Sequence, residues 1–106
     1  IANLYQKMRL YESAITAYNN ILKDYPDTQF KEVILFSIFK SHYNFAQNSI
    51  ASKQGERYQS ALDAYNELVF QFPESKYIRE AAPMNRNLQN EIKNYQQLQS
   101  QISTNN

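Results

Sequence analysis

The sequence predicts an all-α fold built as an array of antiparallel helix pairs. Two observations predict it: a segment that recurs after 47 residues, and apolar residues that fall at helical spacing in both copies. A third observation is a proline at the same point of each copy, where it would end a helix. With 106 residues, the chain has room for one small domain of such units.

The repeated segment covers residues 11–34 and residues 58–81, which align without a gap. An internal period of about 20 to 50 residues indicates stacked supersecondary units, each unable to bury its apolar face alone. The identical pairs are Tyr11/Tyr58, Ser13/Ser60, Ala14/Ala61, Ala17/Ala64, Tyr18/Tyr65, Asn19/Asn66 and Pro26/Pro73.

The period divides the chain into units. We expect a single domain over residues 1–106, a fragment of a longer array, with repeat units at about 11–57 and 58–101. Residues 1–10 then form the end of a preceding helix, and residues 102–106 form a frayed tail.

Each copy begins with an amphipathic helix. Its apolar stripe continues to Pro26 in the first copy and to Pro73 in the second, and proline ends a helix because it lacks the N–H donor and clashes with the preceding turn. Two residues later, Thr28 and Ser75 are placed to cap a second helix. The four tyrosines at equivalent places of the stripe predict core packing rather than an aromatic cage; they are Tyr11, Tyr18, Tyr58 and Tyr65.

The remaining segments follow from composition. Residues 30–46 are apolar around the whole circumference of a helix, which predicts a helix between two neighbours. Residues 47–55 are polar and contain the only glycine, which predicts a loop longer than a helical hairpin needs. Residues 75–101 predict a last helix with a kink or a restart at Pro83.

Composition excludes several classes of function. A net charge of +1 gives no drive toward nucleic acid, and the absence of cysteine excludes a zinc ribbon, a disulfide framework and a thiol nucleophile. One histidine and one glycine cannot form a two-histidine metal site or a glycine-rich phosphate loop, so we expect no metal and no cofactor. The longest apolar run, residues 33–36, is far short of the roughly 20 residues that span a bilayer.

Titratable residues do not predict catalysis. His42 lies within a helical pattern, where a structural or exposed histidine is more common than a proton shuttle. The acidic residues fall at solvent-facing or capping positions, where a carboxylate first of all complements a helix dipole. We therefore expect no enzyme.

The first amphipathic helix resembles the second helix of a tetratricopeptide repeat. The residues that carry this resemblance are Tyr11, Ala14-Ile15, Tyr18, Ile21-Leu22 and Pro26. The period exceeds the roughly 34 residues of the standard unit, mostly through the polar insertion that follows Ala46.

Three segments are similar to the BamD (YfiO) family of outer-membrane protein assembly lipoproteins of Gram-negative bacteria. They are the paired turns KDYPDTQF and FQFPESKY, the stretch KSHYNFAQNSIASKQGERYQSALDAYNEL, and YIREA, which opens the last helix. The resemblance covers nearly the whole chain as the carboxyl-terminal repeats of that family. Pro83 departs from it, because similar proteins continue this helix without proline.

The resemblance implies a tetratricopeptide-like α-solenoid with a right-handed superhelix. Such a protein binds other proteins and catalyses no reaction. It implies the BamA-type barrel-assembly subunit and other assembly lipoproteins as partners, at the periplasmic face of the outer membrane. Membrane attachment would use a lipid anchor outside this sequence. The alternative is another tetratricopeptide adaptor of the periplasm or cell envelope that binds a different protein or peptide.

Three surfaces are candidates for partner binding. The first helix of each tetratricopeptide pair lines the concave surface, where the resemblance places Phe36, Lys40, Tyr43 and Asn44. Lys40 and Asn44 match in residue type a clamp for a terminal carboxylate, although a solvated helix face explains them as well. The other candidates are residues 48–55 and the last apolar stripe, which would alternatively cap the stack: Leu88, Ile92 and Tyr95.

Overall fold

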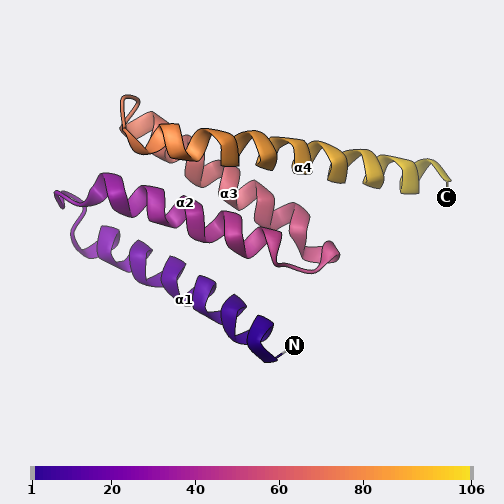
Figure 1. The fold of residues 1–106 in the computed structure, drawn as a ribbon, viewed down its shortest axis with the longest axis horizontal. Helices are drawn as coiled ribbons and strands as arrows, with labels where there is room; N and C mark the ends of the chain where they lie inside the picture. Colours follow the sequence, from indigo (N-terminus) through magenta and orange to yellow (C-terminus); the bar gives the residue numbers. More distant parts are fainter. Residues whose placement is uncertain (1, 106) are drawn as a thin grey trace.

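The computed structural model describes residues 2–105, with side chains described for residues 7–102. Four helices make up this part of the chain, and consecutive helices run antiparallel (Figure 1). The helices are α1 (Ala2–Asp24), α2 (Lys31–Gln47), α3 (Ala51–Gln71) and α4 (Tyr77–Asn105). The predicted all-α array of helix pairs is confirmed.

Helix α2 is at the centre of the array. It contacts α1, α3 and α4, whereas α1 contacts only α2 within the described residues. Its side chains are buried on several sides, among them Phe39, which is completely buried. The prediction that the most apolar helix lies between neighbours is therefore confirmed.

The 47-residue repeat is reproduced in the hydrogen bonds of the two hairpin turns. The Thr28 hydroxyl accepts a hydrogen bond from the Phe30 N–H (3.2 Å), and the Ser75 hydroxyl accepts one from the Tyr77 N–H (3.1 Å). The Ser75 hydroxyl thus satisfies the N–H group of the first residue of α4, as expected for a capping residue. The Thr28 hydroxyl bonds the residue before α2, and α2 itself has no side-chain capping bond at its N-cap residue Phe30. Three backbone N–H to C=O hydrogen bonds also recur in both turns. In the first turn they run from Tyr25 to Ile21, from Thr28 to Tyr25 and from Lys31 to Thr28. In the second turn they run from Phe72 to Leu68, from Ser75 to Phe72 and from Ile78 to Ser75.

The core lies between α2, α3 and α4. Phe39, Leu68 and Leu88, one from each of these helices, are fully buried. The ring of Tyr65 on α3 lies 5.5 Å from that of Phe39, and Tyr58 is only 4% exposed. These two tyrosines therefore pack in or against the core, as the stripe predicts.

Two boundaries differ from those the sequence predicts. α1 runs without a break from Ala2 to Asp24, so residues 1–10 and residues 11–24 do not form two separate helices within the described part. Nothing between them forces a break, because this stretch contains neither glycine nor proline. The predicted loop at residues 47–55 is also wrong, since α3 begins at Ala51 and only residues 48–50 connect it to α2.

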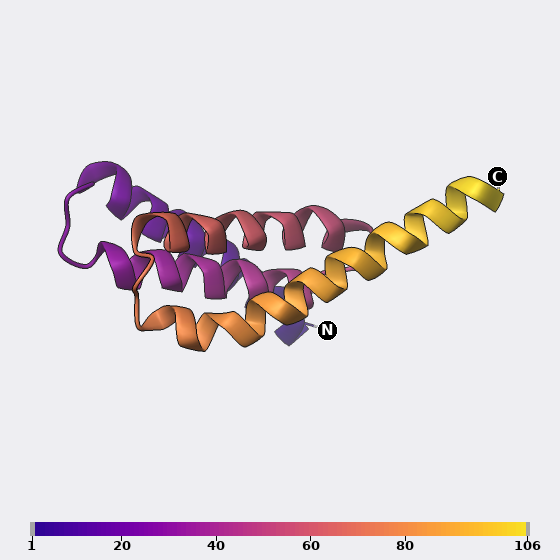
Figure 2. The same cartoon turned by 90° about the horizontal axis from the view of Figure 1, so that it is seen from above.

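The last helix is longer than predicted. α4 continues to Asn105, so the backbone of residues 102–105 is helical rather than frayed. Pro83 lies inside α4 and does not restart it. The carbonyl that loses its donor there belongs to the exposed Arg79, where water can replace the missing bond. Figure 2 shows the axis of α4 changing direction in its amino-terminal half and its carboxyl-terminal half projecting beyond the other helices.

Candidate functional site

Phe36, an aromatic residue predicted to line the concave surface, is not exposed. Phe36 is 5% exposed and stacks on Tyr77 of α4, with the ring centroids 4.9 Å apart. Lys40 also lies over the Phe36 ring, with Nζ 5.2 Å from the ring centroid. The expectation of an exposed Phe36 is wrong, because α4 folds back onto this face of α2.

Tyr43, the second aromatic predicted for that surface, is also buried. It is 8% exposed, and its hydroxyl accepts hydrogen bonds from Asn87 on α4 (2.5 Å) and Gln47 (2.8 Å). The hydroxyl of a buried tyrosine needs hydrogen-bond partners. Tyr43 therefore links α2 to α4 and is not exposed for contact with another protein. Of the four residues predicted for the concave surface, only the exposed Lys40 and the half-buried Asn44 can be reached from solvent.

The predicted stripe on α4 divides into a buried and an accessible part. Leu88 is fully buried, and Ile92 packs half-buried against the core. Tyr95 is half-buried farther along, where α3 begins. The first two residues therefore cap the core, which is the alternative that the sequence left open for this stripe.

A groove lies where α4 passes the start of α3. Its volume is about 370 Å³, and Tyr95 and Tyr58 lie in its wall. Burial raises the pKa of the Tyr58 phenol, and Glu91 and Tyr43 add to the increase, so this hydroxyl stays neutral at physiological pH. Farther out, Leu98 is 57% exposed and Ile102 is 51% exposed, which gives the groove an apolar outer end that the sequence analysis did not single out.

Three exposed aromatic residues lie at or beside the two hairpin turns, which are both at the opposite end of the array (Figure 1). Tyr25 and Phe30 flank the first turn and are 67% and 58% exposed, and Phe70, just before the second turn, is 83% exposed. We call these three residues the turn-end aromatics. All three rings belong to the motifs KDYPDTQF and FQFPESKY, but helical periodicity did not single them out as exposed.

The two turns are held together by a side-chain hydrogen bond. The Ser75 hydroxyl donates to the carboxylate of Glu32 at the start of α2, 2.6 Å away. Ser75 therefore acts at once as the cap of α4 and as a link to α2, which fixes the relative positions of the two turns.

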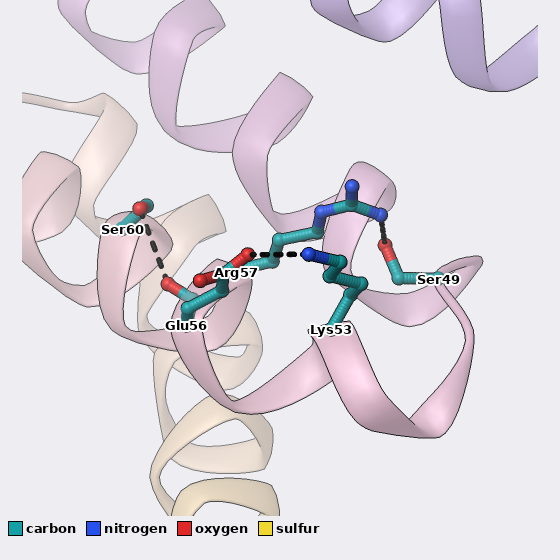
Figure 3. Close-up of polar contacts among 5 residues, drawn as sticks. All are labelled: Ser49, Lys53, Glu56, Arg57 and Ser60. Carbon is teal, nitrogen blue, oxygen red and sulfur yellow. Dashed lines mark hydrogen bonds and ion pairs between the residues drawn. The ribbon is translucent and has the colours of Figure 1, made fainter.

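The corner between α2 and α3 is also well ordered by polar contacts. Arg57 donates to the Ser49 hydroxyl (2.7 Å) and lies over the ring of Phe45, with its Cζ 4.1 Å from the centroid. The Ser49 hydroxyl in turn donates to the Phe45 carbonyl (2.5 Å). Figure 3 shows Arg57 directed at Ser49, while Lys53 and Glu56 form a separate, exposed ion pair. The corner is thus a structural joint, and residues 51–55 of the candidate surface at residues 48–55 belong to α3 rather than to a loop.

His42 is the single histidine of the sequence and lies on α2. His42 lies half-buried in a groove between α1 and α3, where desolvation lowers its pKa and the nearby Asp63 partly opposes that shift. Among the described residues, no three histidine or acidic side chains come together in a way that could hold a metal ion. None of the helices described is both long and apolar enough to cross a bilayer.

Comparison with known proteins agrees with the helix-pair geometry. The family model described as "Tetratricopeptide repeat" matches residues 1–28, which contain all of α1 and the beginning of the first turn. A search of curated proteins finds no significant match to the chain. The fold is that of a tetratricopeptide-like helical array, a class of protein that binds other proteins through its extended surfaces.

Proposed function

We propose that this chain is a non-catalytic docking scaffold of the BamD type, which binds the BamA-type subunit and other assembly lipoproteins of the outer-membrane barrel assembly machinery. The observation that carries the proposal is the pair of equivalent turns, built on YPDT and FPES, with three exposed aromatic rings beside them. These turns are among the segments on which the resemblance to that family rests.

The turn-end aromatics have the properties of a binding hot spot. Large aromatic side chains with polar neighbours dominate the energy of many protein interfaces. Tyr25, Phe30 and Phe70 lie on two hairpins that the bond from Ser75 to Glu32 holds in register, so ordering them on binding costs little entropy. The mechanism is noncovalent positioning of one assembly subunit against another.

The proposed place of action is the periplasmic face of the outer membrane. The resemblance supports it, with attachment through a lipid group on a part of the protein outside these 106 residues. Expression of the full-length protein with its natural leader, followed by membrane fractionation and mass analysis of its amino terminus, tests this part of the proposal.

A second candidate function is a different tetratricopeptide adaptor of the cell envelope that captures a peptide. The groove beside Tyr95 favours it, because a groove of about 370 Å³ with an apolar wall suits a short helical or extended segment. The two functions use opposite ends of the array, so variants at each end distinguish them.

The test is calorimetric titration of this chain with the purified periplasmic domains of a BamA-type subunit. One variant carries Phe30→Ala with Phe70→Ala at the turn end, and the matched variant carries Leu98→Ala with Ile102→Ala in the groove. All four side chains are more than half exposed, so circular dichroism should show both variants as folded as the natural sequence.

We expect saturable binding that weakens at least tenfold in the turn-end variant and stays unchanged in the groove variant. Loss of binding only in the groove variant would assign the partner to the groove instead. Absence of binding by a folded natural sequence would contradict the BamD-type proposal and favour the other adaptor.

A further inference from the structure

The outer face of α4 carries a row of three basic residues. Arg79, Arg86 and Lys93 follow one another at spacings of seven residues, which keeps them on one side of the helix. All three are exposed, and the row is about 21 Å long at 1.5 Å of rise per residue. We call these three residues the α4 basic row.

The internal repeat shows that this face of α4 is not built for the core. At the offset of 47 residues α4 corresponds to α2, and the hydrogen bonds of the two turns keep the same register. The face of α2 that packs into the core shared with α3 and α4 is buried along its length; its residues are Leu35, Phe39, Tyr43 and Ala46. The equivalent residues of α4 are Ala82, Arg86, Asn90 and Lys93, of which the last three are exposed.

This replacement decides what can pack on α4. An apolar helix of the kind that covers α2 would bury the charges of Arg86 and Lys93 without partners, which costs several kcal/mol for each ion. The residues of the face, and not its place in the sequence, are therefore unsuited to an apolar neighbour. α4 has the polar outer face of a helix that caps a solenoid.

The charge of the row is not neutralised from within. Its side chains form no ion pair and no hydrogen bond with other residues in the range 7–102. The two acidic residues of α4 lie on other sides of the helix: Glu91 lines the groove beside Tyr95, and Glu80 is about 100° around the helix from Arg79. The row is thus a positive face on a chain whose net charge is only +1, and its complement is a negatively charged partner.

The neighbours of the row favour a polypeptide partner. Exposed amide side chains flank it, among them Gln89 and Asn90. Amides donate hydrogen bonds to carboxylates and to peptide carbonyls, whereas a helix that lies on lipid needs large apolar residues beside its basic ones. A row one residue wide also matches one face of a helix better than a flat surface.

We propose that the α4 basic row docks an acidic helical segment of another protein, with carboxylates that recur every seven residues. Each carboxylate then lies against one basic side chain. Ion pairs between exposed groups are individually weak, so the contact is reversible and sensitive to salt. The proposal does not depend on the docking function of the turns, because it uses a different surface.

The test is fluorescence anisotropy of a labelled synthetic peptide at low salt, titrated with the full-length protein and with this chain. The peptide is a helix of alanine and glutamine with three glutamates spaced by seven residues, and the control peptide spreads the same glutamates around the helix. We expect the first peptide to bind at least tenfold more tightly. Arg86→Gln with Lys93→Gln should weaken binding at least tenfold, whereas Lys7→Gln with Lys23→Gln removes the same charge from exposed positions of α1 and should leave it unchanged.

Charge reversal separates recognition from loss of folding. Arg86→Glu with Lys93→Glu should abolish binding of the acidic peptide and create binding of the same peptide with lysines in place of its glutamates. Circular dichroism should show every variant as helical as the natural sequence, because the changed side chains are exposed.

Three results would overturn the proposal. The first is no saturable binding of the acidic peptide, or equal weakening by the α1 control. The second is binding by this chain but not by the full-length protein, because another part of the protein would then cover the row. The third is binding to phosphatidylglycerol vesicles that requires Arg86 and Lys93 in the absence of peptide binding, which would assign the row to a lipid surface.

Discussion

The ring of Tyr95 lies directly against the backbone of Gly55, so that a Cβ atom at Gly55 would come within 2.7 Å of the Tyr95 Cζ atom. Gly55 lies inside α3, where glycine destabilises a helix by about 1 kcal/mol relative to alanine. The φ angle of Gly55 is not positive, so its backbone conformation does not require glycine. The close approach of α4 accounts for the only glycine in the chain.

Gly55→Ala should therefore have opposite effects in two backgrounds. In the natural sequence it should lower the free energy of unfolding, because the methyl group displaces the Tyr95 ring. In a chain that already carries Tyr95→Ala, the clash is absent, and the same change should stabilise by about 1 kcal/mol through helix propensity. Urea unfolding followed by circular dichroism measures all four chains, and a stabilising effect in both backgrounds would contradict the contact.

Ser75 and Thr28 provide a matched pair at equivalent turns. Thr28→Ala removes only the hydrogen bond to the Phe30 N–H, at a cost of about 1 kcal/mol. Ser75→Ala also removes the bond to Glu32 and should cost roughly 1 kcal/mol more. Thermal unfolding of the two variants checks this difference. It should vanish when both are made in a Glu32→Ala chain, and equal costs in the natural background would argue against the link between the turns.

Arg57 should stabilise the corner between α2 and α3 even though it is charged. Arg57→Ala removes the hydrogen bond to Ser49 and the contact with the Phe45 ring, so we expect a loss of about 1 to 2 kcal/mol. The control is Arg86→Ala on the exposed side of α4, which should change stability by less than about 0.5 kcal/mol. Chemical denaturation of both variants at one ionic strength gives the comparison, and similar losses would refute the role of the corner.

Leu88 and Leu98 test how far α4 belongs to the core. Leu88 is fully buried, and Leu88→Ala should destabilise by about 2 to 5 kcal/mol because it leaves a cavity among α2, α3 and α4. Leu98 is 57% exposed, and the same substitution there should have an effect within about 0.5 kcal/mol. Hydrogen exchange of α4 amides provides a second measurement, with strong protection expected near Leu88 and weak protection near Leu98. A small effect of Leu88→Ala would mean that α4 does not pack as described.

His42 makes stability depend on pH in the mildly acidic range. Desolvation lowers its pKa in the folded state below the ordinary histidine value of about 6.5, so the unfolded chain binds more protons at this site. Its contribution to stability is therefore complete at higher pH and is lost as the pH falls from the unfolded pKa through the folded one. His42→Gln should flatten this part of the stability profile, measured by urea unfolding between pH 5 and about 8. Asp63→Asn should steepen it, because Asp63 raises the His42 pKa toward the unfolded value, and an unchanged slope in both variants would contradict this assignment.

Some structural features could be read from local patterns in the chain. Helical spacing of apolar residues and the two proline turns predicted the helix-pair array, and the placement of Ser75 predicted the cap of α4. The hydroxyl of Thr28 makes the equivalent bond one residue before α2 begins. Such features depend on neighbours a few residues away, which is why one sequence sufficed. The repeat also predicted core roles for Tyr58 and Tyr65.

The candidate binding residues were predicted less well, because exposure depends on elements far apart in the sequence. Phe36 and Tyr43 belong to an apolar helix whose accessible side cannot be chosen from its own pattern, and Tyr77 and Asn87 of α4 cover them. Phe30 and Phe70, by contrast, carry ordinary core side chains yet lie exposed at the turns.

The class of fold, the repeat and the turn chemistry follow from the amino-acid sequence, because they rest on residue patterns that are visible along the chain. The packing of the helices determines which apolar residues α4 covers, which aromatic rings remain exposed at the turns, and why the glycine lies inside a helix. Those outcomes depend on where the helices cross one another. Three contacts between elements far apart in the sequence hold the helices in place: the hydrogen bond from Ser75 to Glu32, the packing of Tyr95 on Gly55 and the stacking of Phe36 on Tyr77.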